Sequence, residues 1–139
     1  PVASGTSYAP DTGFTSVTPT TLPTEVANTS TVLATKMAEA KTSGKPLVVI
    51  AGNTGCSYCE RLDKVLNADT AFLARTDIVL YRETSPWATN QAGKWTGGGN
   101  FPVLRVTQWD SSGNIVCDKK VNRPQTVAEI EAALGSCSK

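Results

Sequence analysis

The chain has 139 residues, an apolar share of 40% and a formal net charge of +1. This size and composition predict one domain with its own hydrophobic core and room for one appended segment. The even charge balance, without a run of Lys or Arg, argues against binding to nucleic acid or to an anionic membrane surface. No apolar stretch of the sequence approaches the roughly 18 residues of a transmembrane helix.

Residues 1–30 form, in our interpretation, a linker or arm rich in Thr, Ser and Pro, with Asp11 and Glu25 as the charged side chains. Such a composition buries too little apolar surface to offset the entropy lost on ordering. The chain begins with Pro1 rather than Met, so we expect a leader or anchor that is not present in this chain.

The next part of the sequence alternates helical and strand patterns. A helical segment from residue 31 ends at Gly44, and the continuous apolar run 47–51 predicts a strand covered on both faces. A second helix is expected after Cys56, and the run 78–81 predicts a second buried strand. A strand–helix–strand unit of this kind predicts parallel pairing of its two strands.

The remaining sequence predicts a helical stretch, a hairpin and a last helix. Residues 84–100 are expected to form a short helix and then a glycine-rich loop. A strand beginning at Pro102 pairs, across a turn at 110–113, with residues 115–117. A Thr-x-x-Glu capping box then opens the last helix. In this order the elements predict an α/β domain over residues 31–139.

The four cysteines are one close pair, Cys56 and Cys59, and two single residues, Cys117 and Cys137. A Cys-x-x-Cys pair occurs in zinc sites, redox sites and structural crosslinks. Here the pair follows a buried strand and a short turn, so Cys56 lies at a helix N-terminus, where free N–H groups and the helix dipole stabilise a thiolate. The sequence has no histidine to complete a zinc site. The position therefore favours redox exchange over the other two interpretations.

The spacing also predicts different roles for the two cysteines. Cys59 lies one turn into the helix and in line with Leu62 and Leu66, so it should be the more buried of the pair. Cys56 is then expected to attack a substrate disulfide, and Cys59 to resolve the mixed disulfide.

Several segments together resemble the thioredoxin superfamily, and in particular its bacterial thioredoxin-like and disulfide-interchange members. They are Gly44-Lys45-Pro46 before the apolar strand, Cys56-Ser57-Tyr58-Cys59-Glu60-Arg61-Leu62 after it, and Phe101-Pro102 before a later strand. The resemblance covers residues 32–135, about three-quarters of the chain, and the combination is more specific than the cysteine pair alone.

The resemblance implies a thioredoxin fold: a central mixed four-stranded sheet flanked by helices, here with an extended N-terminal segment. It implies that Pro102 is catalytic together with the cysteine pair, and that a cis peptide bond places it beside them. Phe101 would present its backbone to an extended substrate, and Ser57 and Tyr58 would contribute to the substrate-binding rim. No cofactor or metal is implied, because the electrons reside in the two sulfur atoms.

The sequence departs from the family pattern at three places. Gly55 precedes the pair where many members carry Trp, which predicts a more open rim. Ile50 stands where thioredoxins have a buried acid that assists proton transfer to the resolving cysteine. The dipeptide Ser57-Tyr58 matches neither the thioredoxin nor the glutaredoxin pattern. These departures leave the direction of electron flow open.

Cys117 lies in the last predicted strand and Cys137 follows the last helix. A structural disulfide between them is geometrically plausible in this fold, and two free thiols or a second redox relay are the alternatives. A bridge would argue for an oxidising compartment, so we expect an extracytoplasmic location, periplasmic or secreted.

The leading hypothesis is a thiol–disulfide oxidoreductase that acts as a reductase on protein disulfides. Protein thiols and a redox partner protein would be its partners, and the domain would be a monomer without membrane contact. The alternatives are a non-catalytic thioredoxin-like binding or chaperone module, and metal delivery through the thiolate pair. Trp87 and Trp95 could line a groove near the site or belong to the core, and the sequence leaves both open.

Overall fold

The computed structural model describes residues 31–137. The predicted linker or arm of residues 1–30 and the last two residues lie outside this range. The described part contains one mixed four-stranded sheet with the strand order β2-β1-β3-β4. The strands are β1 (Leu47–Gly52), β2 (Val79–Thr84), β3 (Val103–Trp109) and β4 (Ile115–Asn122).

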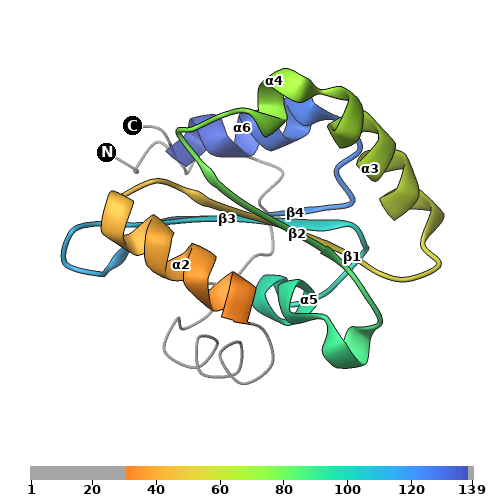
Figure 1. Ribbon diagram of the computed structural model, residues 1–139, viewed down its shortest axis with the longest axis horizontal. Helices are drawn as coiled ribbons and strands as arrows, with labels where there is room; N and C mark the ends of the chain where they lie inside the picture. Colours follow the sequence, from red (N-terminus) through yellow and green to blue (C-terminus); the bar gives the residue numbers. More distant parts are fainter. Residues whose placement is uncertain (1–30, 138–139) are drawn as a thin grey trace.

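Helices cover both faces of the sheet (Figure 1). On one face lie α2 (Thr31–Ser43) and α5 (Gln91–Thr96), which follows the 3-10 helix η3 (Trp87–Thr89). On the other face lie α3 (Ser57–Ala68), α4 (Thr70–Leu73) and α6 (Val127–Cys137).

The central strand β1 contributes side chains to the hydrophobic core on both faces of the sheet. It pairs in parallel with β2 and antiparallel with β3, and all six of its residues are buried. Because side chains alternate along a strand, Val48 and Ile50 pack with α3 and α6, while Leu47 and Val49 pack with α2 and α5. The apolar run therefore supplies both halves of the core. The predicted fold, a mixed four-stranded sheet flanked by helices, is confirmed.

The observed boundaries differ from the predicted ones at two places. β3 begins at Val103 because Pro102 has no N–H to donate to the ladder, and β4 continues to Asn122, beyond the predicted residues 115–117. The one-turn helix α4 was not predicted. The carboxylate of Asp69 accepts a hydrogen bond of 2.9 Å from the N–H of Phe72 and caps this turn.

A buried ion pair links β3 to β4 and to the end of α5. Arg105 is fully buried and donates from Nε and Nη2 to the carboxylate of Asp118 at 2.8 and 2.6 Å. Its Nη1 donates to the carbonyl oxygen of Trp95 at 2.7 Å, and its guanidinium lies 3.9 Å from the centre of the Trp95 ring. Burial, together with the charge of Arg105, lowers the pKa of the neighbouring Lys120. The pair thus anchors the helix that precedes the glycine-rich loop.

A disulfide joins Cys117 in β4 to Cys137 at the end of α6. The Cα atoms are 5.6 Å apart and both side chains are buried, with 5% and 2% of their surface exposed. The bridge fastens the last helix to the outer antiparallel strand, far from the C-terminal end of β1.

Replacing both residues of this bridge, in Cys117→Ala/Cys137→Ala, is expected to lower the free energy of unfolding by about 3 kcal/mol, because the bridge closes a loop of 20 residues in the unfolded chain. Urea unfolding without reductant measures the effect. The matched control is Cys56→Ala/Cys59→Ala, whose three-residue separation predicts a loss of only about 2 kcal/mol. An equal or larger loss in the control would contradict the structural role of the Cys117–Cys137 bridge.

Candidate active site

Cys56 lies where β1 gives way to α3. Its N–H donates to the carbonyl oxygen of Asn53 at 3.2 Å, which closes a turn, and Gly55 within the turn has a φ of +79°. Cys56 is the N-cap of α3, and its sulfur accepts a hydrogen bond of 3.1 Å from the N–H of Cys59. The buried strand and the tight turn therefore deliver one sulfur atom to the N-terminus of a 12-residue helix.

Cys56 and Cys59 form a disulfide, and their Cα atoms are 5.2 Å apart. Cys59 is 2% exposed whereas Cys56 is only half-buried, as the sequence predicts. The N–H of Asn53 donates to the Cys59 sulfur at 3.4 Å. Once the pair is reduced, the backbone N–H groups and the helix dipole favour a thiolate at Cys56, which is the sulfur that a large substrate can reach.

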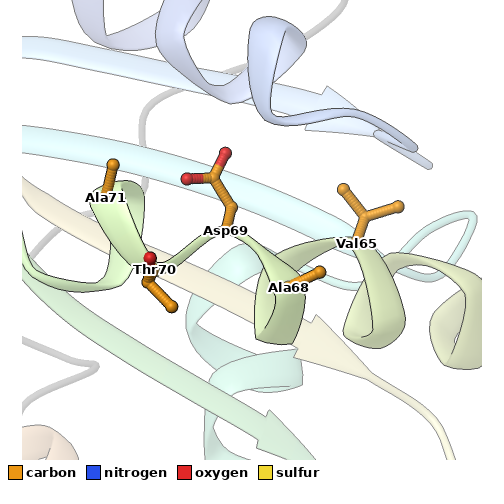
Figure 2. Close-up of a pocket in the computed structure, with 5 residues that line it drawn as sticks. All are labelled: Val65, Ala68, Asp69, Thr70 and Ala71. Atoms are coloured by element: carbon orange, nitrogen blue, oxygen red, sulfur yellow. The ribbon is translucent and has the colours of Figure 1, made fainter.

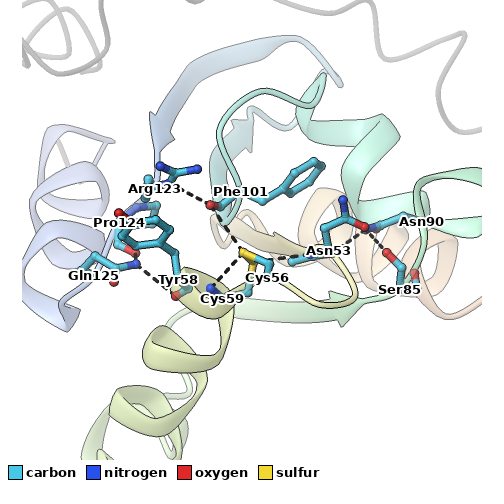
Figure 3. Close-up of a disulfide and its surroundings, with 11 residues drawn as sticks. Asn53, Cys56, Tyr58, Cys59, Ser85, Asn90, Phe101, Arg123, Pro124 and Gln125 are labelled. Carbon is cyan, nitrogen blue, oxygen red and sulfur yellow. Dashed lines mark hydrogen bonds between the residues drawn. A yellow bond between two sulfur atoms is a disulfide. The ribbon is translucent and has the colours of Figure 1, made fainter.

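The loop before β3 passes directly beside the pair (Figure 3). The Phe101–Pro102 peptide bond is cis, and Pro102 is buried. The carbonyl oxygen of Phe101 lies 3.8 Å from the Cys56 sulfur. The structure thus brings Phe101, which is 45 residues from Cys56 in the sequence, and the neighbouring Pro102 to the cysteine pair.

Ser57 and Tyr58, the other two residues expected at the substrate-binding rim, are exposed at the start of α3. Tyr58 is 39% exposed, and the centre of its ring lies 5.1 Å from the guanidinium group of Arg61 and 4.1 Å from that of Arg123. Ser57 makes no contact that distinguishes it from any exposed helix residue.

Arg123 was not predicted as a site residue. It follows β4 with a φ of +54°, its N–H donates to the carbonyl oxygen of Pro102 at 2.6 Å, and its Nε donates to the carbonyl oxygen of Phe101 at 3.0 Å. Figure 3 shows its side chain above the Tyr58 ring and next to the Phe101 oxygen. No sequence pattern marks this residue, because its role depends on a backbone conformation that arginine adopts only rarely.

The sequence model of the thioredoxin-like family matches residues 27–114, more than half of the chain. The chain belongs to the thioredoxin-like family.

Solved structures that are similar to this chain include Trxlp from Edwardsiella tarda, with 18% identity, 69% of this chain and 87% of that chain covered, and a TM-score of 0.47. A disulphide isomerase from Xylella fastidiosa shares 19% identity over 66% of this chain and 72% of its own, with a TM-score of 0.47. Thioredoxin from Trichomonas vaginalis shares 19% identity over 71% of this chain and 85% of its own, with a TM-score of 0.49. No curated protein matches the sequence significantly.

The structure shows the surroundings of two residues, Gly55 and Ile50, at which this thioredoxin-like chain departs from the family pattern. A Cβ atom at Gly55 would have open space around it, so the rim of the site is uncovered at this point. Ile50 is buried, 4% exposed, in the core between the sheet and the helices α3 and α6. At the position where the family resemblance implies a buried acid, the core therefore contains an apolar side chain.

Asn90 is a second residue near the site that the sequence did not predict. It is fully buried, and its Nδ2 donates to the carbonyl oxygens of Gly52 at 2.6 Å and Ser85 at 3.1 Å. Its Oδ1 accepts from the N–H of Gly93 at 2.7 Å and caps α5. An Asn directly before a helix is a recognisable N-cap signal, but its link to the end of β1 is visible only in the structure.

The two tryptophans near the loop have different surroundings. Trp95 is fully buried and stacks on Trp109, with ring centres 6.3 Å apart. Trp87 is 48% exposed and meets the Phe101 ring edge-on at 6.4 Å. Trp95 thus belongs to the core, whereas Trp87 forms part of the surface around the cysteine pair.

Other binding features are few in the part of the chain that the structure describes. Within residues 31–137 there is no cluster of three or more His, Cys, Asp or Glu residues that could hold a metal ion, and no helix is long and apolar enough to cross a membrane. A shallow depression of about 440 Å³ lies at the junction of α3 and α4 (Figure 2). It is lined by Val65 and residues 68–71, at the opposite end of α3 from Cys56.

Gly52, the last residue of β1, lies close to the buried Cys59. A Cβ atom there would lie 2.6 Å from Thr84 Oγ1 and 3.3 Å from Cys59 Cβ. Gly52→Ala is therefore expected to lower the free energy of unfolding by about 1–3 kcal/mol through overpacking. Urea unfolding of the oxidised protein measures this loss.

The second variant in this test is Gly52→Ala/Thr84→Ala. Removing the Thr84 hydroxyl takes away the shortest contact of the added Cβ atom. The double variant, compared with Thr84→Ala alone, should therefore lose much less free energy of unfolding than Gly52→Ala loses relative to the unmodified protein. If the two substitutions are simply additive, the close approach at Gly52 does not determine the packing of Cys59.

Proposed function

We propose that this protein is a thiol–disulfide oxidoreductase that reduces disulfides in other proteins. The single observation that carries the proposal is the cysteine pair itself: a half-buried Cys56 at the N-cap of α3, bridged to a buried Cys59. Membership of the thioredoxin-like family supports the same chemistry. The direction of electron flow rests on analogy with that family.

In the proposed reaction the Cys56 thiolate attacks one sulfur of a substrate disulfide. A bond forms between Cys56 and that sulfur, the substrate bond breaks, and the departing substrate thiolate takes a proton. The Cys59 thiolate then attacks the Cys56 sulfur and releases the second substrate thiolate, which is also protonated. The substrate gains two electrons and two protons, and the protein is left with the Cys56–Cys59 disulfide. A dithiol of a partner protein returns it to the reduced state.

The loop at Phe101 and Pro102 provides the docking backbone in this proposal. The N–H of Phe101 takes part in no hydrogen bond within residues 31–137, whereas its carbonyl oxygen accepts from Arg123. An extended substrate segment can therefore pair with the free N–H beside Cys56 as a short added strand. Pro102 shapes this stretch, because proline offers no donor that would compete for the substrate.

The Cys117–Cys137 bridge supports an extracytoplasmic location, because disulfides that persist as structural links are rare in reducing compartments. We therefore place the protein in the bacterial periplasm or among secreted proteins, acting as a monomer on protein disulfides together with a redox partner protein.

The proposed roles predict what a trapping experiment will find. Cys59→Ser removes the resolving thiol, so the mixed disulfide at Cys56 should accumulate as an adduct that reductant releases. Incubation of the reduced variant with a disulfide-bonded protein, followed by non-reducing electrophoresis and mass spectrometry, detects it. The matched control is Cys56→Ser, which leaves only the buried sulfur and should give at most about a tenth of the adduct.

Equal trapping by the two variants would contradict the assigned roles. If neither variant traps any protein, and if replacing both cysteines leaves the protein's partner interactions intact, the non-catalytic binding module becomes the better account.

A further inference from the structure

Within residues 31–137, two arginines beside Tyr58 form no ion pair with an acidic residue. The guanidinium groups of Arg61 and Arg123 lie 5.1 and 4.1 Å from the centre of the exposed Tyr58 ring. The ion pairs within residues 31–137 use three other arginines, Arg75, Arg82 and Arg105. The side chains of Arg61, Tyr58 and Arg123 therefore form a surface with two uncompensated positive charges, which we call the arginine rim.

The position of Arg123 within the arginine rim is well defined. Its N–H is bound to the carbonyl oxygen of Pro102, and its Nε to that of Phe101. These bonds hold a backbone with a φ of +54°, which a residue with a side chain adopts only where its surroundings require it. Nε is used within the protein, so the two Nη groups remain to donate to a ligand.

The acidic residues on the neighbouring elements do not face the rim. Glu129 of α6 accepts hydrogen bonds from the N–H groups of Gln125 and Thr126, so its carboxylate caps its own helix. Glu60 of α3 lies two positions after Tyr58, and residues with this spacing point to different sides of a helix. Within residues 31–137, these carboxylates are therefore not available to the arginine rim, and the rim is open to a carboxylate of a substrate.

The arginine rim lies close enough to the Cys56 sulfur to contact the substrate residue next to the attacked cysteine. The Phe101 carbonyl oxygen lies 3.8 Å from the Cys56 sulfur and 3.0 Å from Arg123 Nε, so both flank the same atom. Successive Cα atoms of a substrate segment are about 3.8 Å apart. A residue adjacent to the cysteine that Cys56 attacks can thus reach the Nη groups of Arg123.

We propose that the arginine rim is a specificity subsite that selects protein disulfides with an acidic residue next to the attacked cysteine. This inference rests on the proposed function and names the substrate class of the same site. A carboxylate would accept charge-assisted hydrogen bonds from Arg123, and the charge of Arg61, 5.1 Å from the centre of the Tyr58 ring, would add to the attraction.

The test uses three peptide disulfides that differ only in the residue beside the cysteine: Glu, Gln or Lys. The reduced protein should act on the Glu peptide with a kcat/KM about fivefold above that for Gln, and on the Lys peptide below Gln. The difference should lie mainly in KM, because the subsite binds a group that does not react. Raising the NaCl concentration to about 0.5 M should shrink the preference, since salt screens exposed charges.

The variants separate charge from geometry, and the measured quantity is the ratio of kcat/KM for Glu over Gln within each variant. Arg123→Gln should bring this ratio close to one, and Arg61→Gln should reduce it by a smaller factor. Arg123→Lys keeps the charge but loses the planar guanidinium, so it should retain only part of the preference. Lys45→Gln removes one positive charge before β1, at the far end of the strand from Cys56, and should leave both the ratio and the activity unchanged.

The possible outcomes are distinct. If the unmodified protein reduces all three peptides at equal rates, or if Lys45→Gln lowers the ratio as much as Arg123→Gln does, the arginine rim is not a subsite, although the proposed function stands. If it reduces none of the peptides and no other protein disulfide, the proposed function itself fails.

Discussion

The structure depends on the burial of β1 on both faces. The helices α2 and α5 cover β1 on one face and α3 and α6 cover it on the other, so the chain leaves the core only at the end of the strand. β1 ends at Gly52. The turn that follows leads into α3 with Cys56 as its cap. The hydrophobic core thus places a sulfur atom at a helix N-terminus, where backbone N–H groups have no other partner.

A second constraint brings the loop before β3 to the same point. Asn90 ties α5 to the end of β1, and Arg105 ties the other end of α5 to β3 and β4 through Trp95 and Asp118. Between these two anchors the chain has little freedom to place Phe101 elsewhere. The approach of this loop to Cys56 is therefore a property of the sheet and of α5 together, rather than of the loop residues alone.

Much of this arrangement can be predicted from the sequence because its signals are local. The apolar run of β1, the turn before Cys56 and the i, i+3, i+7 spacing of Cys59, Leu62 and Leu66 predict the strand, the helix and the burial of the second cysteine. The link of Asn90 to Gly52 and the position of Arg123 could not be predicted in the same way. Each depends on contacts between residues more than 20 positions apart, and no local pattern encodes such contacts.

The predictions also failed to separate two similar residues. Trp87 lies in η3 and Trp95 in α5, yet the first is exposed beside Phe101 and the second is buried against Trp109 and Arg105. The difference follows from the surroundings of the two segments, because five of the six residues of α5 are buried whereas η3 has no buried residue. Segments of three and six residues are too short for helical periodicity to show which of them enters the core.

Redox function is tested most directly by the redox equilibrium of the Cys56–Cys59 pair in glutathione buffers, measured as a mass shift after alkylation. In the Cys117→Ala/Cys137→Ala background, only this pair contributes to the shift. We expect one two-electron transition with a midpoint near the thioredoxin value of about −270 mV. A midpoint near about −120 mV would contradict the assignment as a reductase, and a pair that does not exchange at all would contradict redox function itself.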